Sequence, residues 1–191
     1  SDPDLWLDFS RMVIPAAYLE QHAGAIERAS NEMRRIEAGE TVNTDEDRMV
    51  GHYWLRAPSL APEALEPAIM RNIAEIKAFA SGVHQGEVLT PADKTFRHLL
   101  VIGIGGSALG PQLAIDALTG TDIPMSIHFF DNTDPDGIDR TLAVLGGKLG
   151  RTLTLVISKS GGTKETRNGM LEAKTAYESV GLDFGRHAVA I

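Results

Sequence analysis

The second half of this 191-residue chain alternates short apolar runs with loops and helix-forming segments. The apolar runs cover residues 99–104, 125–130, 153–157 and 187–191. Helices are expected after the first three of them, at residues 112–118, 135–145 and 164–179. Continuous apolar runs of this length are typical of strands that are buried on both faces of a parallel sheet. The alternation therefore predicts an α/β fold, with right-handed crossovers and an open parallel sheet covered by helices on both faces.

The loop after residues 153–157 is rich in groups that bind anions. It supplies three hydroxyls, one positive charge and two glycines, on Ser158, Ser160, Thr163, Lys159, Gly161 and Gly162. Hydroxyls and backbone N–H groups donate hydrogen bonds, and glycine lets the backbone turn tightly. The loop opens directly onto a helix, whose free N–H groups and dipole favour an anion. Capping by Thr163 would explain one hydroxyl but not three beside a lysine, so we expect a phosphate site.

A second glycine-rich loop, residues 103–108, follows the first apolar run. It fits the loose dinucleotide-binding pattern G-x-G-x-x-A, and Asp131 at the end of the next strand is placed to hold ribose hydroxyls. A nicotinamide-dependent oxidoreductase is therefore one hypothesis, but it does not require a second anion loop. The other hypothesis is that both loops hold one phosphorylated ligand at the carboxyl ends of the strands, with Ser107 facing the hydroxyls of residues 158–163. The second hypothesis accounts for both loops.

The first half of the chain has helical periodicity. Two helices are expected in residues 5–38, and the second ends at Gly39. An amphipathic helix begins at Ser59 or Pro62, ends at Gly82 and is expected to lie against the sheet.

The change in periodicity predicts two domains. Residues 1–90 are expected to form a helical extension that packs on the main domain, and residues 91–191 are expected to form the sheet domain that carries both anion loops.

Composition limits the possible partners. The formal net charge of −8 opposes binding to nucleic acid or to an anionic membrane surface. The chain has no cysteine, and its six histidines do not have the spacing of metal ligands, so no metal site is expected. No apolar run approaches bilayer length, and the first residues are acidic where a signal peptide is basic. These features predict a cytoplasmic protein.

Two motifs resemble those of the phosphoglucose isomerase family. They are Ile-Gly-Ile-Gly-Gly-Ser-Ala-Leu-Gly-Pro at residues 102–111 and Ser-Lys-Ser-Gly-Gly-Thr-Lys-Glu-Thr at residues 158–166. Residues 51–56 and 130–136 are similar to a bacterial branch of the family. The resemblance covers most of the chain. It implies the sugar-isomerase (SIS) fold, a flavodoxin-like sheet of five parallel strands with a helical N-terminal extension.

The family resemblance also implies a function and a set of binding residues. The reaction is the interconversion of glucose 6-phosphate and fructose 6-phosphate through an enediol, in glycolysis and gluconeogenesis and without a cofactor. Gly106 and Ser107 would touch the substrate. Its phosphate would be surrounded by Ser158, Lys159, Ser160 and Thr163, together with Gly161 and Gly162, which stand where some relatives carry larger residues.

Enzymes of this family also have a second SIS domain and a C-terminal segment, which supply the catalytic base, a ring-opening histidine, an arginine and a lysine. Residues 178–181 resemble the motif of the base, but Leu182 replaces its lysine, and Glu178 falls at the far end of a helix. No catalytic residue is therefore expected in these 191 residues, and the chain alone is expected to be inactive. The resemblance implies a homodimer for the whole enzyme. A non-catalytic SIS sensor of sugar phosphates is the other alternative, because it would keep both loops.

Overall fold

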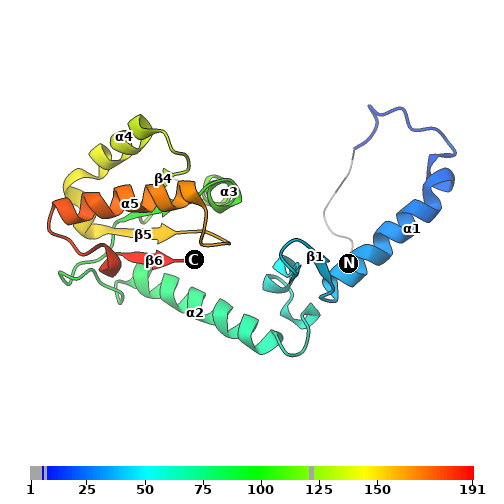
Figure 1. The fold of residues 1–191 in the computed structure, drawn as a ribbon, viewed down its shortest axis with the longest axis horizontal. Coiled ribbons are helices and arrows are strands. Elements are labelled where there is room, and N and C mark those ends of the chain that lie inside the picture. Colours follow the sequence, from blue (N-terminus) through cyan, green and yellow to red (C-terminus); the bar gives the residue numbers. More distant parts are fainter. Residues whose placement is uncertain (1–5, 7, 121–122) are drawn as a thin grey trace. The chain divides into compact units, whose positions relative to one another are not determined.

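The computed structural model describes residues 6, 8–120 and 123–191. Internal contacts divide the chain into two compact units, Ser1–Ile76 and Lys77–Ile191. The first unit is mainly helical and the second is an α/β unit (Figure 1). The domain boundary near residue 90 and the packing of the extension on the main domain stay predictions.

In its described residues, the first unit contains one complete long helix, a small hairpin, two short 3₁₀ turns and the beginning of a second long helix. The complete elements are α1 (Tyr18–Glu37), β1 (Thr41–Asn43), β2 (Arg48–Met49), η1 (His52–Leu55) and η2 (Pro58–Leu60). The two strands pair antiparallel. Helix α1 ends as predicted, because Gly39 adopts a φ of +89° that favours glycine and its N–H donates to the Ile36 carbonyl. Residues 8–17 contain turns but no helix, so the first of the two predicted helices is wrong for these residues; residues 1–5 and 7 lie outside the described part.

Helix α2 (Glu66–Gln85) begins later than the sequence indicated and continues past Gly82. Within the second unit, Val83 is buried and packs with residues of the sheet. Phe79 and, in the first unit, Ile76 are exposed. Within the second unit, the expected contact of this amphipathic helix with the sheet is made at its last turn.

The second unit is built on a parallel sheet with the strand order β4-β3-β5-β6. The strands are β3 (His98–Ile102), β4 (Ser126–Phe130), β5 (Thr152–Val156) and β6 (Ala188–Ala190). All three pairings are parallel, which confirms the α/β prediction. Within the described residues this sheet has four strands where the resemblance implies five, so the strand count and the flavodoxin-like detail stay predictions.

In the described residues of this unit, three helices alternate with the strands. They are α3 (Gly106–Leu118), α4 (Pro135–Leu145) and α5 (Lys164–Ser179), and the 3₁₀ turns η3 (Gly146–Arg151) and η4 (Phe184–Arg186) precede β5 and β6. Helices α4 and α5 confirm the predicted segments. Helix α3 begins six residues before the expected start at Gln112, with Pro111 inside it. A proline lacks the N–H of a helix interior and usually marks a start, so the sequence pattern placed the boundary too late.

Hydrophobic clusters cover both faces of the sheet. One cluster joins Leu100, Ile102 and Phe130 to residues of α4, α5 and η4, and the other joins Leu153 to Val83, Phe96 and Met125. The alternation of neighbouring strand residues between these clusters follows from the two-residue period of a strand. Layers of this kind leave the carboxyl edge of the strands open for loops.

Helix α5 is anchored to the sheet at two points. The buried Tyr177 hydroxyl lies 3.1 Å from Thr154 Oγ1 and donates to the Thr152 carbonyl at 3.0 Å. Burial raises the pKa of Tyr177, so the phenol keeps its proton. Gly169 permits close packing, since a Cβ there would lie 3.1 Å from Ile102 Cγ2. These contacts fix the position of the helix that follows the predicted phosphate loop.

Candidate anion-binding site

The four strands end in one row. Past β3 and β5, the Ile157 N–H donates to the Ile102 carbonyl at 2.8 Å. On the outer sides, the Gly103 N–H donates to the Phe130 carbonyl at 3.1 Å, and the Ser158 N–H donates to the Ile191 carbonyl at 2.8 Å. The two predicted loops therefore leave the same edge of the sheet at the same level.

The order of the strands reverses at β3. Strand β4 lies on one side of β3 and β5 on the other, although they follow one another in the chain. In open α/β sheets, ligands bind outside the carboxyl ends of the strands at such a reversal. The loops after β3 and β5 lie on the two sides of this point.

Hydroxyl groups organise the loop after β5. Ser158 Oγ accepts from the Gly161 N–H at 3.1 Å and donates to Thr163 Oγ1 at 3.3 Å, and Ser160 Oγ accepts from the Gly162 N–H at 3.1 Å. Gly161 has a φ of +68°, a conformation that side chains rarely adopt. A hydroxyl that accepts one bond keeps its proton for donation, so Ser160 and Thr163 can still donate to a ligand.

Helix α5 starts without a side-chain cap. Thr163 occupies the N-cap position, but its side chain makes no capping hydrogen bond. The first intrahelical hydrogen bond is donated by the Arg167 N–H to the Thr163 carbonyl, so the N–H groups of Lys164, Glu165 and Thr166 have no acceptor within the helix. The positive end of the helix dipole and these N–H groups favour an anion. The capping explanation of Thr163 is therefore wrong for its side chain.

A cavity of about 470 Å³ adjoins this loop. It is lined by Val156, Ser158, Gly161, Thr163, Thr166, Arg167, Met170, Ala190 and Ile191. Three of the eight predicted binding residues, Ser158, Gly161 and Thr163, line this cavity. Gly106 and Ser107 do not line it. The side chain of Lys159 is exposed, as are Ser160 and Gly162.

Arg167 is a candidate that the sequence analysis missed. It stands one turn into α5 and lines the cavity together with Ser158 and Thr163. A basic residue in the first turns of a helix opposes the dipole and is unfavourable unless an anion is near. The position of Arg167 near the predicted helix start was therefore a signal of an anion site that the sequence contained.

The loop after β3 forms the start of α3. Gly105 is the N-cap residue, with a φ of +55° and no side-chain cap, so Gly106 and Ser107 lie in the first turn of the helix. Gly106 is exposed and Ser107 half-buried. Gly103 lets this turn approach the strand, because a Cβ at this position would lie 2.8 Å from the Ser107 carbonyl oxygen. The facing of Ser107 toward the hydroxyls of the other loop stays a prediction.

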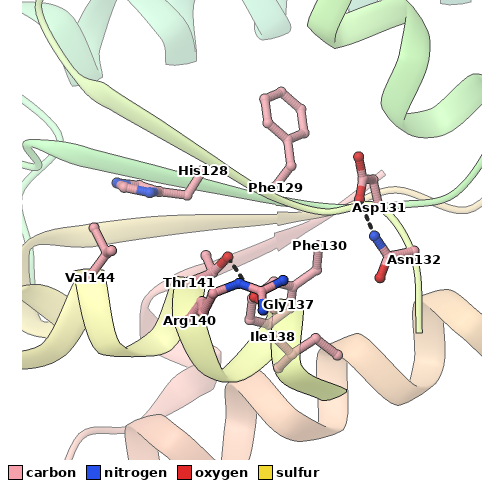
Figure 2. Close-up of a pocket in the computed structure, with 10 residues that line it drawn as sticks. All are labelled: His128, Phe129, Phe130, Asp131, Asn132, Gly137, Ile138, Arg140, Thr141 and Val144. Carbon is pink, nitrogen blue, oxygen red and sulfur yellow. Dashed lines mark hydrogen bonds between the residues drawn. The ribbon is translucent and has the colours of Figure 1, made fainter. Parts of the chain in front are cut away.

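Asp131 is held by two amide groups. Its Oδ2 accepts from Gln112 Nε2 at 2.8 Å. Its Oδ1 accepts from Asn132 Nδ2 at 2.8 Å, as Figure 2 shows. A ribose ligand would have to share or displace these donors. This arrangement gives the carboxylate a role inside the protein and weakens the nicotinamide hypothesis.

A separate pocket of about 320 Å³ lies between β4 and α4, with Asp131 and Asn132 at one end (Figure 2). Arg140 in its lining is 3.5 Å from the carboxylate of Asp134. The hydroxyl in its lining, that of Thr141, donates to the Gly137 carbonyl at 3.0 Å, and the start of α4 is capped by Asp134, so the pocket is a poorer anion site.

Glu178 lies at the last turn of α5 and forms an ion pair with Lys174 at 3.7 Å. The rise of an α-helix places it about 20 Å from the start of α5, so it is a helix-surface charge.

No group of three His, Asp or Glu residues within the described part of the chain is arranged to hold a metal ion. The helices in that part are too short or too polar to cross a membrane.

The fold and the edge define an open parallel α/β protein with two uncapped helix starts beside the reversal of strand order. Residues 8–190 match the family model of phosphoglucose isomerase, and the chain belongs to this family. It is 56% identical over 193 aligned residues to a glucose-6-phosphate isomerase of Geobacter sulfurreducens, and 54% identical over 189 to that of Citrifermentans bemidjiense. These alignments cover 100% and 98% of the chain but 36% of each relative, so the chain spans about a third of their length.

A solved structure agrees with this assignment. The crystal structure of a glucose-6-phosphate isomerase from Chlamydia trachomatis is 28% identical, with a TM-score of 0.77. The comparison covers 93% of this chain and 35% of the other. The predicted family is therefore confirmed.

Proposed function

We propose that this chain is the phosphate-binding part of a glucose-6-phosphate isomerase, which interconverts glucose 6-phosphate and fructose 6-phosphate. The carrying observation is the uncapped start of α5 behind the hydroxyls of Ser158, Ser160 and Thr163. This arrangement presents N–H and O–H donors to an anion at the carboxyl edge of the sheet. Membership of the family supports a sugar phosphate as that anion and favours an isomerase over a sensor or an oxidoreductase.

In this proposal the chain positions the substrate and does not transfer its proton. Interconversion of an aldose and a ketose requires a base within hydrogen-bond reach of a carbon-bound proton. Donors that hold the phosphate fix the sugar relative to such a base, so binding energy becomes orientation. We assign Gly106 and Ser107 to contacts with the substrate, and the loop residues Ser158, Lys159, Ser160, Gly161, Gly162 and Thr163 to the phosphate.

Titration of the 191-residue chain with glucose 6-phosphate tests the assignment. Amide chemical shifts in an NMR titration should move at residues 158–166, and glucose without phosphate should leave them unchanged. Ser160→Ala should raise the dissociation constant about tenfold, the cost of one hydrogen bond to a charged group. Equal responses to glucose and glucose 6-phosphate would contradict phosphate recognition.

An activity assay tests whether the chain only positions the substrate and does not supply the catalytic base. The chain alone should form no fructose 6-phosphate at the rate of a whole isomerase, because none of the groups placed at this edge is assigned as the base. Turnover at a normal enzyme rate would show that the base lies within these residues.

We further propose that the whole enzyme works as a homodimer in the cytoplasm. Exposed leucines on α3, among them Leu113 at 71% and Leu118 at 84%, support burial of this face in an assembly. Sedimentation of the longer protein would test the dimer, and a monomer at micromolar concentration would contradict it.

A further inference from the structure

We propose that Gln112 and Asp131 form a positioning pair that holds the first turn of α3 in place for the sugar phosphate. This inference rests on the proposed function, because it assigns Gly106 and Ser107 to the substrate. Neither member of the pair needs to touch the ligand. The pair acts by keeping α3 at a fixed place on the carboxyl edge.

Helix α3 has little other anchorage. Ala108 is its one buried residue in the described part of the chain, whereas Leu109, Leu113 and Leu118 are exposed. Burial of apolar area normally fixes a helix on a sheet, and here that contribution is small. Polar contacts consequently have more weight in setting the position of α3.

The hydrogen bond from Gln112 to Asp131 can fix the position of α3, because it joins the middle of the helix to the end of β4. Gln112 lies six residues after Gly106, and Asp131 follows β4 directly. The contact is part-buried and 2.8 Å long, and its acceptor is a carboxylate, which makes a stronger bond than a neutral acceptor.

The strand end that carries Asp131 is itself fixed to the glycine loop. The Phe130 carbonyl accepts from the Gly103 N–H at 3.1 Å, so β4 contacts this segment through its backbone as well as through the Asp131 side chain. Asn132 Nδ2 donates to the other carboxylate oxygen and holds its orientation. The two connections act at opposite sides of the turn that contains Gly106 and Ser107, so together they define its position.

Loss of the hydrogen bond between Gln112 and Asp131 should weaken the contacts with the sugar more than the contacts with the phosphate. Gln112→Leu and Asp131→Ala should each raise the dissociation constant for glucose 6-phosphate about three- to tenfold, the effect of one lost hydrogen bond. The affinity for inorganic phosphate should be unchanged, because the Ser158–Thr163 loop is anchored to β5. The double variant should be no weaker than the worse single variant, since both remove the same contact.

Asp131→Asn provides a conservative rescue. Its amide oxygen can still accept from Gln112, so affinity should return close to that of the unaltered chain. Asp116→Ala, which removes an exposed carboxylate from the same helix, is the matched control and should have no effect.

Hydrogen exchange gives a second readout that needs no ligand. The Ala108 and Leu109 N–H groups donate to the Gly105 carbonyl at 3.0 and 2.8 Å. These amides should exchange faster in Gln112→Leu, while the amide of Ile157 should keep its protection. Equal loss of protection at all three would indicate general destabilisation and would overturn the proposal.

Two further results would overturn it. One is unchanged glucose 6-phosphate affinity in Gln112→Leu, and the other is an Asp131→Asn variant as weak as Asp131→Ala, which would indicate that the charge itself acts on the ligand. Failure of the unaltered chain to bind glucose 6-phosphate would instead contradict the proposed function and, with it, the ligand-positioning role. The exchange experiment would then decide separately whether the pair fixes α3.

Discussion

Helices α4 and α5 both begin just past a strand of the same sheet, but their first turns are satisfied in different ways. Asp134 caps α4, accepting from the N–H groups of Asp136 at 3.3 Å and Gly137 at 3.0 Å. Thr163 has the corresponding position in α5 and makes no capping bond. The same N–H groups that a cap satisfies in α4 therefore remain available to a ligand in α5.

This difference shows how one edge of the sheet can combine stability with binding. A capped start contributes to folding and has a negative charge that repels an anion. An uncapped start gives up that contribution and keeps its donors for the ligand. Helix α3 also lacks a side-chain cap, because Gly105 has no side chain, but its Ser107 N–H already donates to the Ile104 carbonyl at 3.1 Å.

The largest expected effect is on the free energy of unfolding, at Gly103, where the first turn of α3 lies close to the end of β3. Gly103→Ala would place a Cβ 2.8 Å from the Ser107 carbonyl oxygen, a backbone atom that can yield only if α3 shifts. We expect the free energy of unfolding in urea to fall by about 2 kcal/mol, as for other overpacked sites.

Gly110→Ala is the matched control on the same helix. No heavy atom lies within 4 Å of its added Cβ, so stability should be unchanged or rise by roughly 0.5–1 kcal/mol. If both variants lost the same stability, the close approach at Gly103 would not be the cause.

Thr163→Ala tests the uncapped start directly. Because the side chain does not cap α5, the free energy of unfolding should change by no more than about 0.5 kcal/mol. The dissociation constant for glucose 6-phosphate should rise about tenfold, which corresponds to about 1.4 kcal/mol. Chemical denaturation and calorimetric titration give the two numbers, and a large stability loss with unchanged affinity would reverse the assignment.

Asp134→Ala should give the opposite result at α4. Loss of the cap should lower the free energy of unfolding by about 1 kcal/mol, while glucose 6-phosphate affinity stays the same. Asp139→Ala, an exposed carboxylate further along α4, should leave both quantities unchanged. Weakened binding in Asp134→Ala would mean that the capped and uncapped starts are not independent.

The smallest expected effect is on the pH dependence of stability, and it concerns two histidines of the sheet that lie away from its open carboxyl edge. His98 on β3 and His128 on β4 have ring centroids 6.3 Å apart, and each has a buried ring nitrogen without a hydrogen-bond partner. Burial lowers the pKa of both rings below the ordinary value of 6.5, and the charge of Lys148 lowers it further. Just below pH 6.5 the two imidazole rings therefore stay neutral in the folded chain, whereas in the unfolded chain they take up protons.

Stability from this pair is complete above pH 6.5 and falls as the pH drops toward the folded pKa values. Thermal melting between pH 8 and pH 5 should show this fall, and His128→Gln should reduce it. The same substitution at the exposed His84 should leave the pH dependence as it was. An unchanged pH profile in His128→Gln would exclude the pair as its source.

Patterns that depend on local chemistry were readable from the chain. Strand β5 and helix α5 were predictable because an apolar run, hydroxyls, glycines and a helix-forming segment follow one another without a break. The start of α3 was misplaced because Pro111 inside a helix is unusual. The contact between Gln112 and Asp131 could not be predicted, since it joins residues 19 positions apart whose meeting depends on how α3 lies against the end of β4.

The sequence by itself determined the alternation of strands and helices, the family, and the kinds of donor present in the two loops, because these depend on residue type and spacing. Only the tertiary structure decided that Thr163 leaves α5 uncapped while Asp134 caps α4, and that Asp131 accepts from Gln112 and Asn132. The reason is that a short polar side chain at a helix start has several hydrogen-bond partners within reach, and the packing of neighbouring elements selects among them.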